Sequence, residues 1–180
     1  FEPIWTAVRQ TWRQPPRVHQ AVVAEVRSIV AEAVGAPPSD YDVIFTANTT
    51  DAINLVAESE GRTGTHGIPP VVINTWLEHN SNELPWRTVP GATLLRLPMD
   101  AEGFLDLRQL EGWLREYNQD MQHGEKRVGI VAVTGASNVL GVANDLAEIA
   151  RIVHRYGARL LVDGAQLVAH RRIEMAATGI

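Results

Sequence analysis

A short apolar strand that ends in an aspartate constrains the fold of this chain more than any other feature. Leu160, Leu161 and Val162 form an apolar run without a polar break, and Asp163 and Gly164 follow it directly. Such a run is typical of a strand buried on both faces in a parallel sheet covered by helices. Ligands bind beyond the carboxyl ends of these strands, so the aspartate is expected where a parallel α/β protein has its site. An aspartate in a Val-Asp-Gly segment can also simply cap the next turn, so both interpretations stay open here.

Composition restricts the class of protein. The 180 residues are 45% hydrophobic and 21% charged, which is ordinary for one globular domain. A net charge of −5 without a basic run argues against a nucleic-acid partner. The longest apolar runs, such as Val128 to Val133, are too short to span a membrane, and no signal pattern opens the sequence. We therefore expect a cytoplasmic protein with no membrane partner. The absence of cysteine excludes disulfides, thiolate metal sites and cysteine nucleophiles from these residues, and no metal site is expected.

Helical and strand patterns alternate along the chain. Apolar residues recur at helical spacing or as short runs between turn residues. In order, they predict a helix over 17–34, a strand over 42–45, a helix over 52–57, strands over 71–74 and 92–97, a helix over 107–117, a strand over 128–133, a helix over 146–156 and the strand over 158–163. Right-handed crossovers then give an α/β fold with a mostly parallel sheet and helices on both faces. We expect residues 1–40 to be a helical lead-in and residues 41–180 to be a partial large domain, truncated because the sequence does not start with Met and ends soon after the last strand.

Polar side chains follow several of these strands at the same edge of the sheet. Threonines at the start of the second predicted helix suit a phosphate, although ordinary N-capping explains them as well. A histidine just past a strand can lie flat on a ring or simply be structural. The polar stretches are Asn48-Thr49-Thr50, Glu78-His79-Asn80, Ser137-Asn138 and Asp163-Gly164-Ala165-Gln166. Together they offer a phosphate site, a flat imidazole, amides and a carboxylate that keeps a pyridine nitrogen protonated, which is the set that pyridoxal phosphate requires.

At these residues the sequence resembles the class V aminotransferase family of fold-type I pyridoxal-phosphate enzymes, and most closely its cysteine desulfurase and selenocysteine lyase branch. The resemblance covers most of the chain from about residue 43 onward. The matching stretches are Phe45-Thr46-Ala47-Asn48-Thr49-Thr50-Asp51-Ala52-Ile53-Asn54-Leu55-Val56-Ala57, Glu78-His79-Asn80-Ser81-Asn82 with Pro85-Trp86, Ser137-Asn138-Val139-Leu140-Gly141, and Val162-Asp163-Gly164-Ala165-Gln166 with His170. Glu-His-Asn-Ser-Asn departs from the commoner Glu-His-His-Ala-Asn, which leaves the substrate open.

The resemblance implies pyridoxal 5′-phosphate as cofactor and a role for each matching residue. Its catalytic residues would be His79, which stacks on the cofactor ring, and Asp163, which pairs with the pyridine nitrogen. Glu78 would be a support beside the histidine. The implied cofactor-binding set is Thr49 and Thr50 at the phosphate, Gln166 at the phenolic oxygen, Asn138 near that oxygen or the substrate carboxylate, and His79 and Asp163 at the ring.

The family's Schiff-base lysine is not found among these residues. In the family it follows the pyridine-binding aspartate by roughly two dozen residues, which falls past Ile180. Lys126, the one lysine of the sequence, precedes a strand and so belongs at the opposite edge of the sheet. We therefore expect this piece to lack the catalytic lysine, together with the small domain that carries the substrate-binding arginine and any persulfide-forming cysteine.

The resemblance implies a pyridoxal-phosphate-dependent enzyme that acts on a small-molecule amino-acid substrate as a homodimer. Desulfurase-type β-elimination from cysteine or a related substrate is the best match, because Asp-Gly-Ala-Gln and Ser-Asn-Val-Leu-Gly are most similar to that branch. A class V aminotransferase, an epimerase and kynurenine-type cleavage stay open, as does a non-catalytic, degenerate protein of the same fold. A nucleotide-binding α/β domain is weakly supported, because no glycine-rich fingerprint follows a strand.

Overall fold

The computed structural model describes residues 16–63 and 68–180, and these fall into two compact units. The smaller unit comprises the described residues up to Ile44 together with Arg172–Ala176. The larger unit comprises Phe45–Arg171 and Ala177–Ile180, and it contains the sheet and the helices around it. Within the described ranges, no helix is both long and apolar enough to cross a membrane.

The smaller unit is built on α2 (Pro16–Ala33), which confirms the helix predicted over 17–34. Its carboxyl end contacts a segment from late in the chain, because the carbonyls of Val34 and Gly35 accept hydrogen bonds from the backbone N–H groups of Met175 and Ala176 at 2.9 and 3.1 Å. Gly35 has φ +61°, and a Cβ there would lie 2.9 Å from the Cα of Glu174. The turn after α2 therefore requires glycine at this position. The short helix α8 (Met175–Thr178) follows the same late segment.

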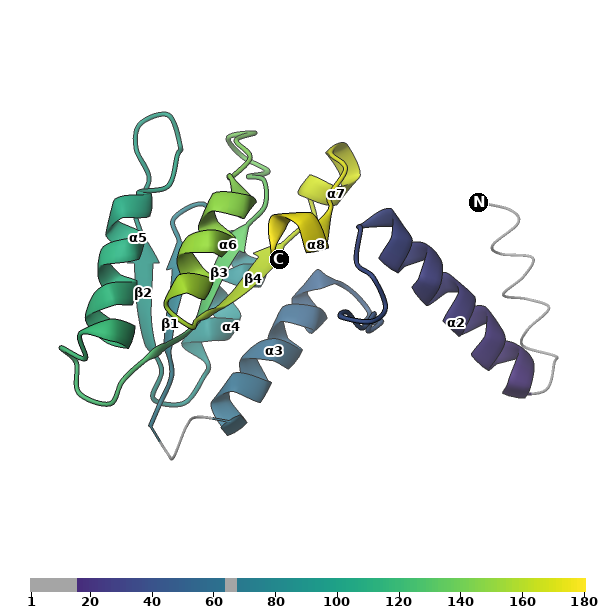
Figure 1. The fold of residues 1–180 in the computed structure, drawn as a ribbon, viewed down its shortest axis with the longest axis horizontal. Helices are drawn as coiled ribbons and strands as arrows, with labels where there is room; N and C mark the ends of the chain where they lie inside the picture. Colours follow the sequence, from purple (N-terminus) through teal and green to yellow (C-terminus); the bar gives the residue numbers. More distant parts are fainter. Residues whose placement is uncertain (1–15, 64–67) are drawn as a thin grey trace. The chain divides into compact units, whose positions relative to one another are not determined.

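The larger unit contains a four-stranded, all-parallel sheet in the order β2-β1-β3-β4 (Figure 1). The strands are β1 (Val71–Thr75), β2 (Thr93–Leu97), β3 (Val128–Thr134) and β4 (Arg159–Asp163). Ile73 of β1 pairs with Leu95 of β2 and with Val131 of β3. Thr134, the last residue of β3, pairs with Asp163, the last residue of β4. All strands thus end at one edge, as the alternating pattern of the sequence predicted.

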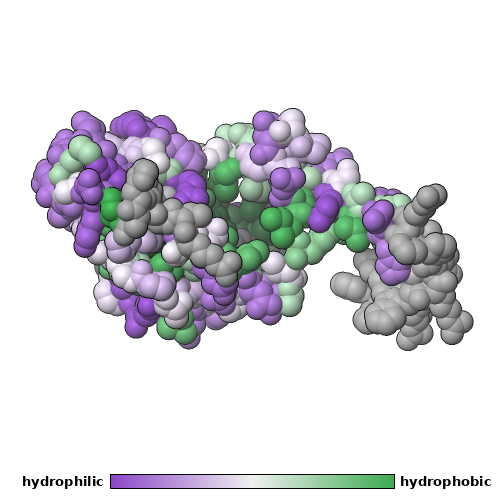
Figure 2. All heavy atoms as spheres, turned by 90° about the horizontal axis from the view of Figure 1, so that it is seen from below, coloured by the Kyte–Doolittle hydropathy of each residue, from purple (hydrophilic) through white to green (hydrophobic). Residues whose placement is uncertain are grey.

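Helices cover both faces of this sheet. One face packs against α3 (Thr49–Thr63) and α4 (Leu84–Arg87) in a core cluster made of Ile53, Ala57, Val72, Trp86, Val89, Ile130 and Ala132. The alternate strand residues point to the other face. That face is covered by α5 (Leu107–Leu114) and α6 (Leu146–Arg155), which lie on the near side of the sheet in Figure 1. Figure 2 shows hydrophilic side chains over much of the visible outer surface of the larger unit.

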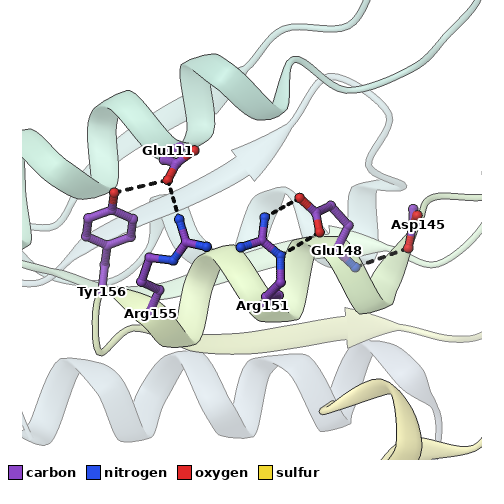
Figure 3. Close-up of polar contacts among 6 residues, drawn as sticks. All are labelled: Glu111, Asp145, Glu148, Arg151, Arg155 and Tyr156. Atoms are coloured by element: carbon purple, nitrogen blue, oxygen red, sulfur yellow. Dashed lines mark hydrogen bonds and ion pairs between the residues drawn. The ribbon is translucent and has the colours of Figure 1, made fainter.

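One ion pair and one hydrogen bond connect α5 to the end of α6 on the outside of the fold (Figure 3). Nη1 of Arg155 lies 2.8 Å from Oε1 of Glu111, and the hydroxyl of Tyr156 donates to the same oxygen at 3.2 Å. Asp145 caps the start of α6, because its Oδ1 accepts from the backbone N–H of Glu148 at 3.1 Å. Exposed ion pairs of this kind stabilise a protein by at most about 1 kcal/mol each. Most of the stability of the packing between these helices and the sheet therefore comes from their buried apolar side chains.

Three details differ from the sequence predictions. No strand forms over 42–45, where the chain is irregular and Ile44 is 70% exposed, because this short apolar run has no neighbouring strand to pair with. The strand that ends at Asp163 forms as β4, but it is the edge strand of the described sheet, so Leu160 to Val162 are half-buried rather than buried on both faces. The helix predicted over 107–117 is α-helical only to Leu114 and continues as a π-helical turn, η3 (Arg115–Gln119).

Candidate active site

A cavity of about 280 Å³ lies at the carboxyl edge of the sheet, where β3 and β4 end. All six residues predicted to form the site line it, and they come from four separate segments of the chain. The lining residues are Asn48, Thr49, Thr50, His79, Ser81, Thr134, Ala136, Asn138, Asp163, Ala165 and Gln166. The structure therefore brings the predicted residues together around one space.

The first turn of α3 forms one wall of this cavity. Oδ1 of Asn48 accepts a hydrogen bond from the backbone N–H of Asp51 at 2.9 Å, so Asn48 serves as the N-terminal cap. Thr49 and Thr50 are the first two residues of the 15-residue helix, and their N–H groups have no partner within the helix. Capping therefore does not use the threonine side chains, and this helix start presents hydroxyls, N–H groups and the positive end of the helix dipole.

The loop after β1 forms a second wall and is held by the carboxylate of Glu78. Oε1 accepts from the hydroxyl of Thr75 at 2.6 Å and from the backbone N–H of Thr134 at 2.9 Å. Oε2 accepts from Nδ2 of Asn82 at 2.6 Å, and Oδ1 of Asn82 in turn accepts from Nε1 of Trp86 at 3.1 Å. Glu78 thus ties the end of β1, the end of β3 and the following 3-10 turn, η2 (Asn80–Asn82), to one another. This arrangement fits the supporting role expected for it.

Burial raises the pKa of Glu78 from its usual value of 4.5 to about 7. The hydrogen bonds from Thr75, Thr134 and Asn82 act in the opposite direction, because they stabilise the carboxylate, and the charge of Asp163 adds a smaller upward effect. A carboxyl whose pKa is raised by burial and by the charge of a second carboxylate is a common feature of functional sites.

Asp163 ends β4 and is only 6% exposed. Its Oδ1 accepts from the backbone N–H of Ala165 at 3.0 Å, and among the described residues this is the only hydrogen bond that its carboxylate accepts. Its backbone carbonyl accepts from the N–H of Gly135 at 2.8 Å. A Cβ on residue 135 would lie only 2.7 Å from Cδ2 of Leu167, so this position has room for glycine alone. The aspartate is therefore fixed by its backbone, and its carboxylate keeps lone pairs for a ligand in the cavity.

Asn138 and Gln166 present side-chain amides to the same space. In the part of the chain that the structure describes, neither amide has a hydrogen-bond partner, and both side chains are exposed. Asn138 is held in a tight turn, because Oγ of Ser137 accepts from the N–H groups of Val139 and Leu140 at 3.3 and 3.2 Å. These amides can donate to or accept from a ligand group.

The sequence prediction missed several lining residues, and Ser81 is the one that contacts two of the predicted site residues. Oγ of Ser81 lies 2.9 Å from Nδ1 of His79 and 2.9 Å from Oγ1 of Thr50. In the sequence, Ser81 was noticeable only because it departs from the commoner motif. That departure does not indicate a contact with Thr50, which lies 31 residues away.

Lys126 lies at the opposite edge of the sheet, as predicted, with Nζ donating to Oγ1 of Thr93 at 3.4 Å. Among the described residues, no group of three or more His, Cys, Asp or Glu side chains could hold a metal ion.

A sequence model of the family described as aminotransferase class-V matches residues 8–180. The chain belongs to this family. The class-V match confirms the resemblance noted for the motifs, and it extends that resemblance over nearly the whole sequence.

Relatives of the chain include proteins named cysteine desulfurase. The chain is 42% identical over 160 residues to a cysteine desulfurase of Dickeya dadantii, covering 87% of this chain and 36% of the relative. It is 42% identical over 144 residues to a probable cysteine desulfurase of Halalkalibacterium halodurans, covering 78% of this chain and 33% of the relative. The chain thus spans about a third of the length of the curated relatives that it matches.

Solved class-V structures share the fold. A cysteine desulfurase from Escherichia coli superimposes with a TM-score of 0.77 at 27% identity, covering 99% of this chain and 45% of that one. An apo cysteine desulfurase from Thermococcus onnurineus superimposes with a TM-score of 0.78 at 28% identity, covering 99% and 44%. These likenesses confirm the predicted α/β fold with a parallel sheet and helices on both faces.

Proposed function

We propose that this chain is part of a pyridoxal-phosphate-dependent cysteine desulfurase and supplies most of the wall against which the cofactor lies. The observation that carries the proposal is the single cavity lined by Thr49, Thr50, His79, Asn138, Asp163 and Gln166. The relatives named cysteine desulfurase support cysteine as the substrate over the aminotransferase and epimerase alternatives.

The start of α3 fits the phosphate end of the cofactor. Helix N-termini bind phosphate because free N–H groups and the helix dipole both favour an anion. The hydroxyl of Thr49 and the backbone N–H groups of Thr49 and Thr50 are the donors at this helix start, and the side chain of Asn48 already satisfies the N–H of Asp51. We assign these two threonines to the phosphate.

The other residues that line the cavity fit the pyridine ring. A buried carboxylate with unused lone pairs is the group required beside a protonated ring nitrogen, and Asp163 lines the cavity with one oxygen bound to a backbone N–H. The imidazole of His79 would lie on the face of the ring, and the amides of Gln166 and Asn138 would bind the phenolic oxygen or the substrate carboxylate. The donor set in the cavity therefore matches the chemical groups of pyridoxal phosphate.

The proposed role of each residue follows from this fit. When bound, pyridoxal phosphate supplies an electron sink for a carbanion at the α-carbon of an amino acid. Asp163 holds the proton on the ring nitrogen, and His79 keeps the ring plane in place. Glu78 holds the loop that carries the histidine. The homodimer and the cytoplasmic location expected from the sequence are part of the same proposal.

The proposal is tested on the full-length protein that contains this chain. Borohydride reduction followed by peptide mass mapping should find a pyridoxyl-lysine, and cysteine with excess dithiothreitol should yield equal amounts of alanine and sulfide. A pyridoxyl-lysine without alanine or sulfide would contradict the desulfurase activity but would still support pyridoxal phosphate as the cofactor. No pyridoxyl-lysine and no turnover would mean a non-catalytic protein of this fold.

A further inference from the structure

Ser81 connects the two walls of the cavity. Its Oγ lies 2.9 Å from Nδ1 of His79 in the same loop and 2.9 Å from Oγ1 of Thr50 in the first turn of α3. The backbone N–H of Ser81 also donates to Nδ1 of His79, at 3.2 Å. The serine is half-buried and lines the cavity itself, so these contacts lie beside the proposed cofactor ring.

The backbone contact decides the direction of the other hydrogen bonds. A backbone N–H can only donate, so Nδ1 of His79 must offer its lone pair. Among the two neutral forms of the imidazole, this selects the one with its proton on Nε2. The hydroxyl of Ser81 can then only donate to Nδ1, and its oxygen is left to accept from the hydroxyl of Thr50.

We infer that Ser81 is a positioning residue, whose hydroxyl and N–H together hold His79 in the Nε2–H tautomer and link its ring to the start of α3 through Thr50. The effect of Ser81 on cofactor binding rests on the proposed function. In that function His79 supports the cofactor ring and the start of α3 binds the phosphate, and Ser81 connects the two. The ring and the phosphate site then keep a fixed spacing before any cofactor binds, which lowers the cost of ordering the site.

The sequence provides a favourable variant for the test. The commoner motif has alanine where this chain has Ser81, so Ser81→Ala should fold. It removes the hydroxyl and leaves the backbone N–H in place. Ser81→Thr keeps both donors. Ser39→Ala is a matched control, because the Ser39 hydroxyl donates only to the exposed Asp40 at 2.9 Å and lies in the smaller unit.

The direct test is long-range proton–nitrogen NMR of the full-length protein labelled with ¹⁵N-histidine and freed of cofactor, with the His79 signals assigned by their loss in His79→Gln. We expect the proton on Nε2 and an Nδ1 signal typical of a hydrogen-bonded acceptor. In Ser81→Ala the Nδ1 signal should move, while Nε2–H stays the major tautomer, and in Ser81→Thr and Ser39→Ala it should not move. A proton on Nδ1 in the unaltered protein, or an Nδ1 signal unchanged in Ser81→Ala, would overturn the inference.

A second readout measures the consequence for the site. The dissociation constant for pyridoxal phosphate should rise roughly threefold to tenfold in Ser81→Ala, the loss expected for one hydrogen bond, and return in Ser81→Thr. An unchanged dissociation constant would contradict the positioning role. Because the spectra need neither cofactor nor substrate, a protein that shows the Nε2–H tautomer but does not bind pyridoxal phosphate would refute the proposed function and not the tautomer.

Discussion

The carboxylate of Glu78 accepts a hydrogen bond from the backbone N–H of Thr134 at 2.9 Å, across 56 residues of sequence. This bond fastens the loop after β1 to the end of β3, the strand beside β4 and Asp163. The neighbouring residue, His79, lies at the cavity as a result. A single half-buried carboxyl therefore links two segments that line the candidate site.

Glu78 should make the stability of the protein depend on pH. Because burial raises its pKa to about 7, the folded protein binds more protons at this group than the unfolded chain between the usual pKa of 4.5 and 7. Its contribution to the free energy of unfolding is fully present below the lower value and falls as pH rises through 7. Glu78→Gln should reduce this fall, as measured by urea unfolding at pH 5, 6, 7 and 8.

The matched control for this measurement is Glu125→Gln, since Glu125 is an exposed loop residue. Glu125→Gln should leave the slope of the free energy of unfolding against pH unchanged. The contributions of all other ionisable groups are the same in the variant and in the parent protein, so they cancel in the comparison. Equal slopes for the parent protein and Glu78→Gln would show that the burial of Glu78 does not influence folding.

Asp163→Asn should separate the fold from the chemistry. The amide oxygen can still accept from the N–H of Ala165, and the side chain keeps its volume, so the unfolding midpoint should change little. An amide cannot hold a proton on the ring nitrogen, so cysteine turnover in the full-length protein should fall by roughly 100-fold or more, comparable to the loss of one preorganised electrostatic contact. Turnover close to that of the unaltered protein would exclude the assigned role of Asp163.

His79→Ala should weaken retention of pyridoxal phosphate and alter its visible absorbance. The loss of a stacked ring costs about 0.5–1.5 kcal/mol, so the dissociation constant should rise roughly twofold to tenfold. His123→Ala is the control, because His123 stacks on Tyr117 at 3.8 Å and does not line the cavity. An unchanged spectrum and affinity in His79→Ala would contradict the stacking role.

The sequence was sufficient to predict that the candidate site residues lie together, because parallel strands end at one edge. Asp163 is the last residue of one strand and Asn138 follows another, and both strands are recognisable from their apolar runs, so the meeting of these residues follows from topology. The contacts of Ser81 with Thr50 and of Glu78 with Thr134 depend on side-chain packing between distant segments, which no local pattern encodes. The strand predicted over 42–45 failed for the same reason, because strand formation needs a neighbour that the segment itself does not specify.

Trp86 should stabilise the loop of Glu78 through one buried hydrogen bond. Its ring is 1% exposed in the core against the sheet, and its Nε1 donates to Oδ1 of Asn82, a residue that is fully buried and whose Nδ2 donates to Glu78. Trp86→Phe fills most of the same space but leaves Oδ1 of Asn82 unpaired, which should cost about 1–3 kcal/mol. Trp86→Ala adds a cavity and should cost about 3–5 kcal/mol.

Urea unfolding of the two Trp86 variants separates these contributions. Trp76→Phe is the control, because Trp76 is 57% exposed and its ring, which lies 4.2 Å from the guanidinium of Arg96, is replaced by another ring. We expect a cost for Trp86→Phe that clearly exceeds the control and that shrinks when Asn82 is replaced by leucine, since no oxygen is then left unpaired. If Trp86→Phe costs no more than Trp76→Phe, the indole N–H does not contribute to holding Asn82, and the loop is held by the carboxylate of Glu78 alone.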